Sequence, residues 1–197
     1  MKLYTSIGPN PGVVTLYLAA KSLQLPTETI DIMKGENRQS DYVARNPVGQ
    51  TPLLEFDDGT PISESIAICE YLEELHPTPS LIGVTPEERA VTRMWVRRID
   101  LLYVQPLTAG FRAAEGLPMF KDRMRCLPEA AAGLKASAAD GLKLVDTQLA
   151  GHRFVVGDRL TLADLLLQAF VDFGASVGQA ADPALTHLAD WRARRAV

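Results

Sequence analysis

Apolar and polar positions along the first 76 residues change period several times, and each period predicts an element. Residues 2–6 predict a short strand, and residues 11–23 predict a helix with one apolar face. Residues 29–33 alternate between polar and apolar and predict a second strand. A strand, a helix and a strand in this order predict parallel pairing through a right-handed crossover.

The segment 34–50 is polar and predicts little more than short helical pieces. The pair Asp58-Gly59 lies between two short apolar runs, 52–56 and 60–62, and therefore predicts a β-hairpin. Residues 65–75 predict a helix that ends at His76-Pro77. The first 76 residues are thus expected to fold as β-α-β-α-β-β-α with a mixed sheet.

Beyond residue 76 no strand pattern is found, so an all-helical domain is expected over residues 88–197. Three prolines and one glycine within residues 77–87 predict the linker. Helices are predicted over 86–114, 128–149 and 183–195. A further, strongly apolar helix follows Thr161 and Asp164, which have the spacing of a capping box.

Charge and composition add little to this picture. The net charge is -4 without a long block of like charge, so no nucleic-acid partner is expected. Residues 1–76 hold 5 Lys and Arg against 11 Asp and Glu. This imbalance fits a separate first domain, and a chance distribution on a solvated surface explains it equally well. No apolar run reaches the roughly 20 residues of a membrane span, so no membrane association is expected.

The two cysteines, Cys69 and Cys126, have neither metal-binding spacing nor a CxxC partner. We therefore expect no metal site. No secretion signal is recognised at the N-terminus, which predicts a cytoplasmic, reducing location.

Two segments resemble a known family. The segment 46–74 has the sequence NPVGQTPLLEFDDGTPISESIAICEYLEE, and the segment 157–167 has the sequence GDRLTLADLLL. Together they resemble the cytosolic glutathione transferases over nearly the whole chain. The opening MKLYTSIGPNPGVVTLYLAAK resembles bacterial and fungal members near the theta-like branch. The resemblance implies a thioredoxin-like domain over 1–76 that binds glutathione as a substrate, a helical domain that lines an electrophile pocket, and a homodimer.

The resemblance implies a glutathione site built largely from backbone. The bond between Thr51 and Pro52 is expected to be cis, so that the backbone of Thr51 pairs with the cysteinyl backbone of glutathione. An ordinary trans proline that begins a strand is the alternative. Ser65 is expected to bind the γ-glutamyl carboxylate at a helix N-terminus, and Glu64 the ammonium group. The alternative is that these residues only cap the helix.

The glycyl carboxylate of glutathione is expected to meet Gln50 and Asn37, which stand where relatives usually have Lys or Gln and His or Lys, respectively. Because neutral donors bind carboxylates less strongly than charged ones, weak affinity for glutathione is predicted relative to lysine-bearing relatives. Lys34, Arg38 and Gln39 lie close in sequence and either compensate or belong to the solvated surface.

The loop SIGPNPGVV (residues 6–14) follows the first strand and contains no residue that titrates near neutral pH. Gly8 stands where many relatives have Ser or Thr. This loop contains no cysteine, so a mechanism that uses a protein thiol at this position is excluded. Asn10 and Ser6 are therefore the candidate catalytic residues, with the N–H of Gly12 behind them, because each can donate a hydrogen bond to a thiolate. Asn10 as an N-cap and Ser6 pointing into the sheet are the alternatives.

Tyr103, Leu107 and Phe111 form one stripe of the helix predicted over 86–114 and are candidates for an electrophile pocket; plain core packing is the alternative. Trp191 and Arg194 are expected to be structural. The leading hypothesis is a glutathione transferase that acts on small apolar electrophiles in detoxification. A glutathione-dependent disulfide or peroxide reductase on the same fold and a non-catalytic scaffold are the alternatives.

Overall fold

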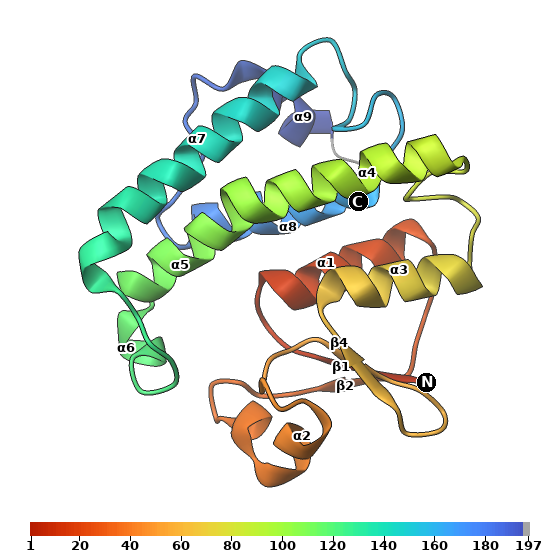
Figure 1. Ribbon diagram of the computed structural model, residues 1–197, viewed down its shortest axis with the longest axis vertical. Helices are drawn as coiled ribbons and strands as arrows, with labels where there is room; N and C mark the ends of the chain where they lie inside the picture. The colour runs from red at the N-terminus through yellow and green to blue at the C-terminus, as the bar shows by residue number, and fades with distance from the viewer. Residues whose placement is uncertain (195–197) are drawn as a thin grey trace. The chain divides into compact units, whose positions relative to one another are not determined.

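The computed structural model describes residues 1–194 and divides the chain into two compact units, with the division between Ile82 and Gly83. The division falls within the segment 77–87. The first unit contains every strand of the described chain, and the second is helical (Figure 1). This is the thioredoxin-like domain followed by a helical domain that the sequence predicted.

The first unit is built on a mixed sheet in the order β2-β1-β3-β4. β1 (Lys2–Thr5) pairs in parallel with β2 (Thr27–Thr29) and antiparallel with β3 (Leu53–Glu55), which pairs antiparallel with β4 (Pro61–Ser63). α1 (Pro9–Ala20) and α3 (Ser65–Leu75) cover one face, and α2 (Ser40–Arg45) lies on the other side of the sheet (Figure 1). A single 3-10 turn (Glu36–Arg38) precedes α2.

Several boundaries in the first unit differ from the prediction; β1 ends at Thr5 and α1 at Ala20, both earlier than predicted. β2 ends at Thr29, where the predicted strand 29–33 begins, because the Asp31 carboxylate accepts hydrogen bonds from the N–H groups of Met33 and Lys34, both at 3.0 Å, and turns the chain there. α1 begins at Pro9 rather than at residue 11, because Gly8, at φ 120°, ends the loop in a conformation that favours glycine.

The helical unit contains α4 (Pro86–Ile99), α5 (Gln105–Ala113), α6 (Leu117–Phe120), α7 (Ala131–Leu149), α8 (Leu162–Ser176) and α9 (Thr186–Arg194), with a 3-10 turn (Pro128–Ala130) before α7. α8 is its core element, since residues 161–171 are all buried. The predicted capping box of Thr161 and Asp164 begins it. α9 begins later than predicted, because Asp182 accepts the N–H of Ala184 in a turn at 2.9 Å. Residue 195 of that prediction lies outside the described residues.

The helix predicted over 86–114 is interrupted by a π-helical turn (Asp100–Val104) between α4 and α5. Pro106 has no N–H, so the Leu102 carbonyl loses its partner four residues later. The chain widens there, and the Gln105 N–H bonds to the Asp100 carbonyl. Gly141 of α7 packs against the freed carbonyl, since a Cβ at this position would lie 2.1 Å from the Leu102 oxygen.

Candidate functional site

The strand register brings three segments of the first unit to one end of the sheet. Leu53, the first residue of β3, pairs with Tyr4 near the end of β1 and with Ser63 at the end of β4. The loop before β3, the loop after β1 and the turn after β4 therefore meet at this end. Most of the candidate glutathione-binding residues predicted from the sequence lie in or next to these three segments, whereas Asn37 lies in the 3-10 turn before α2.

The N-termini of α1 and α3 converge at the same end. Ser65 Oγ donates a hydrogen bond to Asn10 Oδ1 at 3.4 Å, which joins the first turns of the two helices. Neither helix has a side-chain hydrogen bond at its N-cap, Gly8 for α1 and Glu64 for α3. The first-turn N–H groups of α3 point out of the helix, and two positive dipole ends lie side by side. This arrangement favours an anionic ligand.

Asn10 is the second residue of α1 and not its N-cap, so the alternative that it only caps the helix is wrong. Its Oδ1 accepts the bond from Ser65, and its amide NH₂ has no hydrogen-bond partner within residues 1–194. The Gly12 N–H is not available, because it donates to the Gly8 carbonyl at 3.1 Å. Asn10 thus presents a free donor beside two helix N-termini.

Ser6 is oriented differently from Asn10. Its hydroxyl donates to the Ile30 carbonyl at 2.7 Å, and a serine has a single O–H to give. In this geometry Ser6 ties the end of β1 to the segment after β2.

Glu64 has an unusual backbone conformation, with φ 72° in a residue that is not glycine. Such strain persists where the surrounding structure enforces it, and it is concentrated at functional sites. The Glu64 side chain is exposed, whereas Ser65 beside it is buried. The carboxylate of Glu64 has no ion-pair partner in the described chain, so it remains open to a cation.

The Thr51-Pro52 peptide bond is cis, so the alternative of an ordinary trans proline is wrong. Within the described chain, no backbone hydrogen bond involves the N–H or the carbonyl of Thr51. The residue therefore offers an open pair of backbone groups beside the β3 end of the sheet.

The loop before Thr51 is held by residues that the sequence reasoning missed. The Gln50 carbonyl accepts hydrogen bonds from the Tyr42 hydroxyl at 2.7 Å and from Asn46 Nδ2 at 2.8 Å. Tyr42 and Asn46 are buried. The only local signal for this support is Asn46-Pro47, which is typical of a turn.

Asn37 also supports this loop. It is buried, and its Nδ2 donates to the Gly49 carbonyl at 2.6 Å. Arg38 donates to the Val48 carbonyl at 3.3 Å, and Lys34 pairs with Asp31. Gln50 and Asn37 were the two candidates for binding a ligand carboxylate. The half-buried Gln50 side chain is the more accessible of the two.

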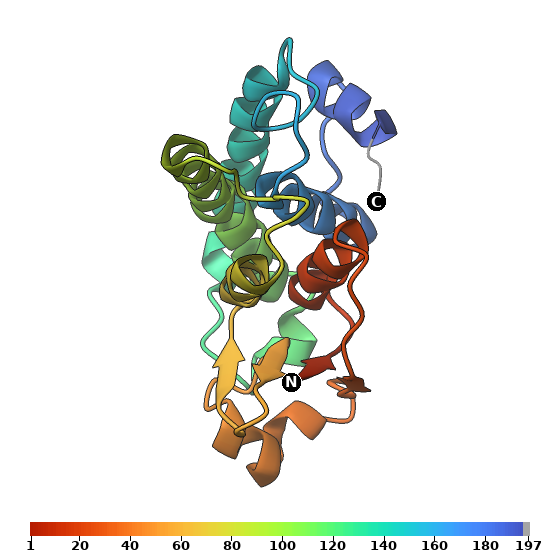
Figure 2. The ribbon, with the colours of Figure 1, turned by 90° about the vertical axis from the view of Figure 1, so that its right-hand side faces the viewer.

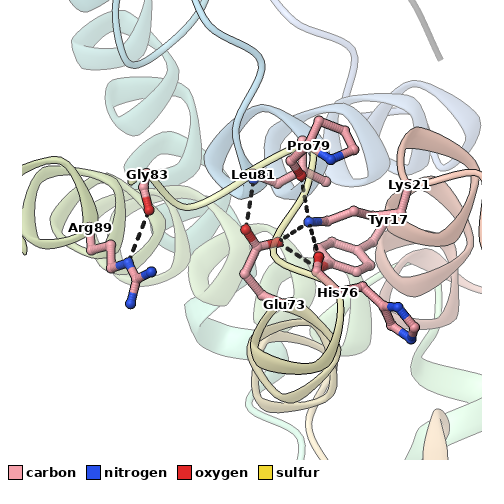
Figure 3. A network of polar contacts seen from close by, with 8 residues as sticks. All are labelled: Tyr17, Lys21, Glu73, His76, Pro79, Leu81, Gly83 and Arg89. Atoms are coloured by element: carbon pink, nitrogen blue, oxygen red, sulfur yellow. Dashed lines mark hydrogen bonds and ion pairs between the residues drawn. The ribbon is translucent and has the colours of Figure 1, made fainter. Parts of the chain in front are cut away.

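A buried ion pair, also missed by the sequence reasoning, joins the other ends of α1 and α3 (Figure 3). Lys21 Nζ lies 2.7 Å from Glu73 Oε2 and donates to the carbonyls of His76 and Pro79. Tyr17 Oη also donates to Glu73 Oε2, at 2.7 Å.

Burial acts to raise the pKa of Glu73, but the bonds from Lys21, Tyr17 and the N–H of Leu81 outweigh it, and the pKa is lowered. Burial and the Glu73 carboxylate raise the pKa of Tyr17. Glu73 therefore stays ionised at neutral pH, and its ion pair with Lys21 joins the ends of α1 and α3.

The three residues of the predicted electrophile stripe differ in their surroundings. Tyr103 is 2% exposed and donates from Oη to the Phe170 carbonyl at 3.1 Å, and Leu107 is 1% exposed. Phe111 is half-buried and meets Phe173 edge-on at a centroid distance of 5.2 Å. Within the helical unit, Tyr103 and Leu107 belong to the core, and Phe111 is the most open of the three.

The described residues contain no group of three or more His, Cys, Asp or Glu side chains that could hold a metal ion. No helix among them is long and apolar enough to cross a membrane. Cys69 and Cys126 are both free thiols, and burial raises the pKa of Cys69.

A thioredoxin-like unit with a cis-proline loop and two open helix N-termini, followed by a helical unit, is the architecture of glutathione-transferase-like proteins. The glutathione S-transferase N-terminal domain family matches residues 1–74, and the glutathione S-transferase C-terminal domain family matches residues 117–196. The chain belongs to the glutathione S-transferase family.

Similar proteins come from a yeast and from bacteria. Glutathione S-transferase 2 of Saccharomyces cerevisiae is 34% identical over 177 residues, which cover 88% of this chain and 75% of the yeast protein. A glutathione S-transferase domain-containing protein of Marinobacter aquaeolei VT8 has a crystal structure with a TM-score of 0.92 at 36% identity, covering 98% of this chain and 96% of that chain. Maleylacetoacetate isomerase of Pseudomonas aeruginosa is 30% identical over 195 residues, which cover 96% of this chain and 90% of that protein.

Proposed function

We propose that this protein is a glutathione transferase that binds glutathione at the first unit and stabilises its thiolate for attack on a small apolar electrophile. The backbone N–H of Ser65 and the first turn of α3 bind the γ-glutamyl carboxylate, because the Ser65 hydroxyl is donated to Asn10, and Glu64 binds the ammonium group. The backbone of Thr51, next to Pro52, pairs with the cysteinyl backbone. Gln50 meets the glycyl carboxylate, and buried Asn37 supports the loop that carries Gln50.

The chemistry at the sulfur follows from the donors present. The thiol loses its proton to water, since Asn10 cannot accept one, and the thiolate accepts a hydrogen bond from the Asn10 amide. The thiolate sulfur then attacks the electrophilic carbon, and the leaving group departs with its electron pair. This is stabilisation of an anion by a fixed donor and not general-base catalysis.

One observation carries this proposal: Ser65 Oγ bonds to Asn10 Oδ1 and thereby orients the Asn10 amide with its NH₂ group free. A free donor at the N-terminus of one helix, next to the anion-binding end of another, fits a ligand with a carboxylate and a thiolate a few bonds apart. Ser6 is the second candidate for this role, because its hydroxyl already donates a hydrogen bond to the Ile30 carbonyl.

Asn10→Ala tests the role of this donor. Removing the donor should raise the pKa of bound glutathione by roughly one unit and slow turnover near neutral pH by about tenfold. The thiolate absorbance of bound glutathione, titrated against pH, measures the first effect. Stability should change little, because Gly8 and not Asn10 occupies the cap position. Ser6→Ala is the matched control, and a larger pKa shift in that variant would transfer the role to Ser6.

The reaction type needs its own comparison, because one relative that covers nearly the whole chain is named as an isomerase. Parallel assays with an aryl halide, a glutathione mixed disulfide and maleylacetoacetate separate a transferase from a reductase and from an isomerase. Retention on immobilised glutathione separates all three from a non-catalytic scaffold. Conjugation of the aryl halide as the fastest of the three reactions is the expected result, and it would fit a role in detoxification.

A homodimer in the cytoplasm is the expected setting. An exposed apolar stripe on α4 and the π-helical turn supports the dimer: Val91, Met94, Leu101 and Leu102 are 42%, 39%, 48% and 44% exposed. Exposed apolar side chains gathered on one element are typical of a protein–protein interface.

The two free cysteines fit a reducing compartment. The third residue of the electrophile stripe, Phe111, is our choice for contact with the second substrate.

A further inference from the structure

A second concave site lies entirely within the helical unit, between the end of α7 and one face of α9. This pocket has a volume of about 340 Å³. His152 and Arg153 line it from the segment after α7, and His187, Asp190 and Arg194 line it from α9. The last three recur at helical spacing and share one face of α9. Figures 1 and 2 show α9 beside the C-terminal part of α7.

The α9 wall of the pocket is fixed by the opposite face of the helix. Trp191 is 2% exposed and donates from Nε1 to Asp164 Oδ1 at 3.1 Å. The N–H of Leu188 donates to Asp146 Oδ1 of α7 at 2.8 Å. Both anchors would have to break for α9 to rotate, so the lining residues of α9 are held in place before any ligand binds.

The opposite wall is fixed by the turn that ends α7. Gly151 has φ 76°, which favours glycine and reverses the chain, and the His152 N–H donates to the Leu149 carbonyl at 3.0 Å. The Arg153 guanidinium lies 5.3 Å from the centroid of the Phe154 ring, and Phe154 is buried. The cation is thus positioned by an aromatic side chain and not by a carboxylate.

The charges in the pocket favour an anion. Arg153 and Arg194 oppose the single carboxylate of Asp190, and neither arginine has an ion-pair partner among residues 1–194. An unpaired guanidinium presents a planar fork of donors that matches an oxyanion. Two of the three histidines of the chain line the pocket as well, and each imidazole can donate a ring N–H.

The geometry points to a binding site for a small, doubly charged oxyanion of the sulfate or phosphate-monoester type in this pocket. Arg153 and Arg194 bind the oxyanion from opposite walls, and His152 and His187 donate to it. The groups that face the two histidines are Arg153 from the α7 end and Asp190 and Arg194 from α9.

Sulfate is the probe of choice, because it presents the doubly charged oxyanion alone. Addition of sulfate to the full chain should shift the imidazole NMR signals of His152 and His187 saturably, with a dissociation constant of roughly 1 mM. His76 lies in the other unit and is the internal reference. Equal shifts at His76, or none at the other two histidines, would overturn the proposal.

Variants make the test specific to the pocket. R153Q and R194Q should each weaken sulfate binding at least severalfold, and the double variant H152Q/H187Q should weaken it as well. R125Q removes the same charge from an exposed position outside the pocket and should leave binding unchanged. If R125Q weakened sulfate binding equally, binding would depend only on the net charge of the protein, and the proposal would be overturned.

The oxyanion could be free or part of a lipid headgroup, and two further arms distinguish these sources. The soluble arm uses glycerol phosphate, and the second arm uses phosphatidylcholine vesicles that contain phosphatidic acid. A pocket closed on two sides predicts binding of the soluble ester and no sedimentation with vesicles. Vesicle binding that R153Q abolishes, without binding of the soluble ester, would contradict the small-ligand form of the proposal.

Discussion

Glu64 combines a strained backbone with an unpaired carboxylate. The strained backbone lowers the stability of the fold, whereas the carboxylate favours binding of the ligand. The residue sits at φ 72°, where glycine is favoured, directly before the helix that binds the γ-glutamyl group in the proposed complex. A protein selected for stability alone would have glycine here. The side chain is therefore expected to contribute to ligand binding and not to folding.

Two substitutions at Glu64 separate these effects. E64Q keeps the backbone and removes the charge, so it should leave unfolding unchanged and weaken glutathione binding by about tenfold. E64G should weaken binding as much while stabilising the fold by about 1 kcal/mol, because the strain disappears. Chemical denaturation and calorimetric titration with glutathione measure the two quantities. Binding by E64Q that equals that of the unchanged protein would remove Glu64 from the site.

Sequence reasoning at this scale succeeded where a residue acts through its backbone. The cis bond at Pro52 was predicted because the surrounding motif is specific. The alternative that Asn10 is an N-cap is wrong, because Gly8 is the N-cap of α1 and Pro9 is its first residue. The contacts of Ser6 with Ile30 and of Asn37 with Gly49 join distant segments, and no local pattern encodes them.

At the scale of elements, α1 and α3 form a parallel pair with contacts at both ends. Asn10 and Ser65 meet at the N-terminal end, and Lys21 and Glu73 pair at the other. Removing one member of a buried ion pair leaves a buried charge without its partner. The pair therefore sets the relative position of the helices, and with it the distance between the two N-termini.

E73Q tests this pair. The variant should lose about 3 kcal/mol of stability near neutral pH, because Lys21 is left without its counter-charge. The folded pKa of Glu73 is depressed, so its stabilising contribution is present above the unfolded pKa and is lost as the pH falls through the folded value. E73Q should therefore show a flatter acid limb in urea unfolding measured against pH. E74Q, an exposed neighbour on the same helix, is the control and should match the unchanged protein.

The junction of α4 and α5 shows why one element boundary escaped prediction. The apolar stripe continues through residues 86–114, so periodicity alone predicts one helix. Pro106 at the second position of α5 disrupts the hydrogen-bond ladder without ending the stripe, and the chain accommodates it with a π-helical turn. The compensating partner, Gly141, lies on another helix and gives no signal in the local sequence.

Gly141→Ala tests that packing. The added methyl group would lie 2.1 Å from the Leu102 oxygen, so α7 must move away, at a cost of about 3 kcal/mol in the free energy of unfolding. Gly133→Ala on the same helix is the matched control, since its methyl group would meet nothing within 4 Å. That change should stabilise the helix by up to about 1 kcal/mol. Thermal unfolding of both variants checks the contrast, and equal effects would rule out the close approach at Leu102.

For the whole molecule, the order of elements was predictable because each unit uses its own hydrophobic period. Residues 1–76 alternate between period two and period 3.6, whereas the rest follows the helical period. The domain order and the family followed from this pattern and two motifs. Assembly was predicted only from the resemblance, because an exposed apolar side chain and a buried one look alike in a sequence.

The structure shows which apolar side chains of α4 and of the π-helical turn are exposed, and these residues allow a direct test of the proposed homodimer. Val91 and Leu101 are apolar and exposed, so a second copy of the chain would gain by covering them. The double variant V91D/L101D should sediment as a monomer at concentrations where the unchanged protein is a dimer, because each subunit would bury two unpaired charges at the interface. L144D adds a charge at another exposed leucine, on α7, and should remain dimeric. A dimer that survives V91D/L101D would move the interface elsewhere on the molecule, and monomers of all three proteins at every concentration would exclude the dimer itself.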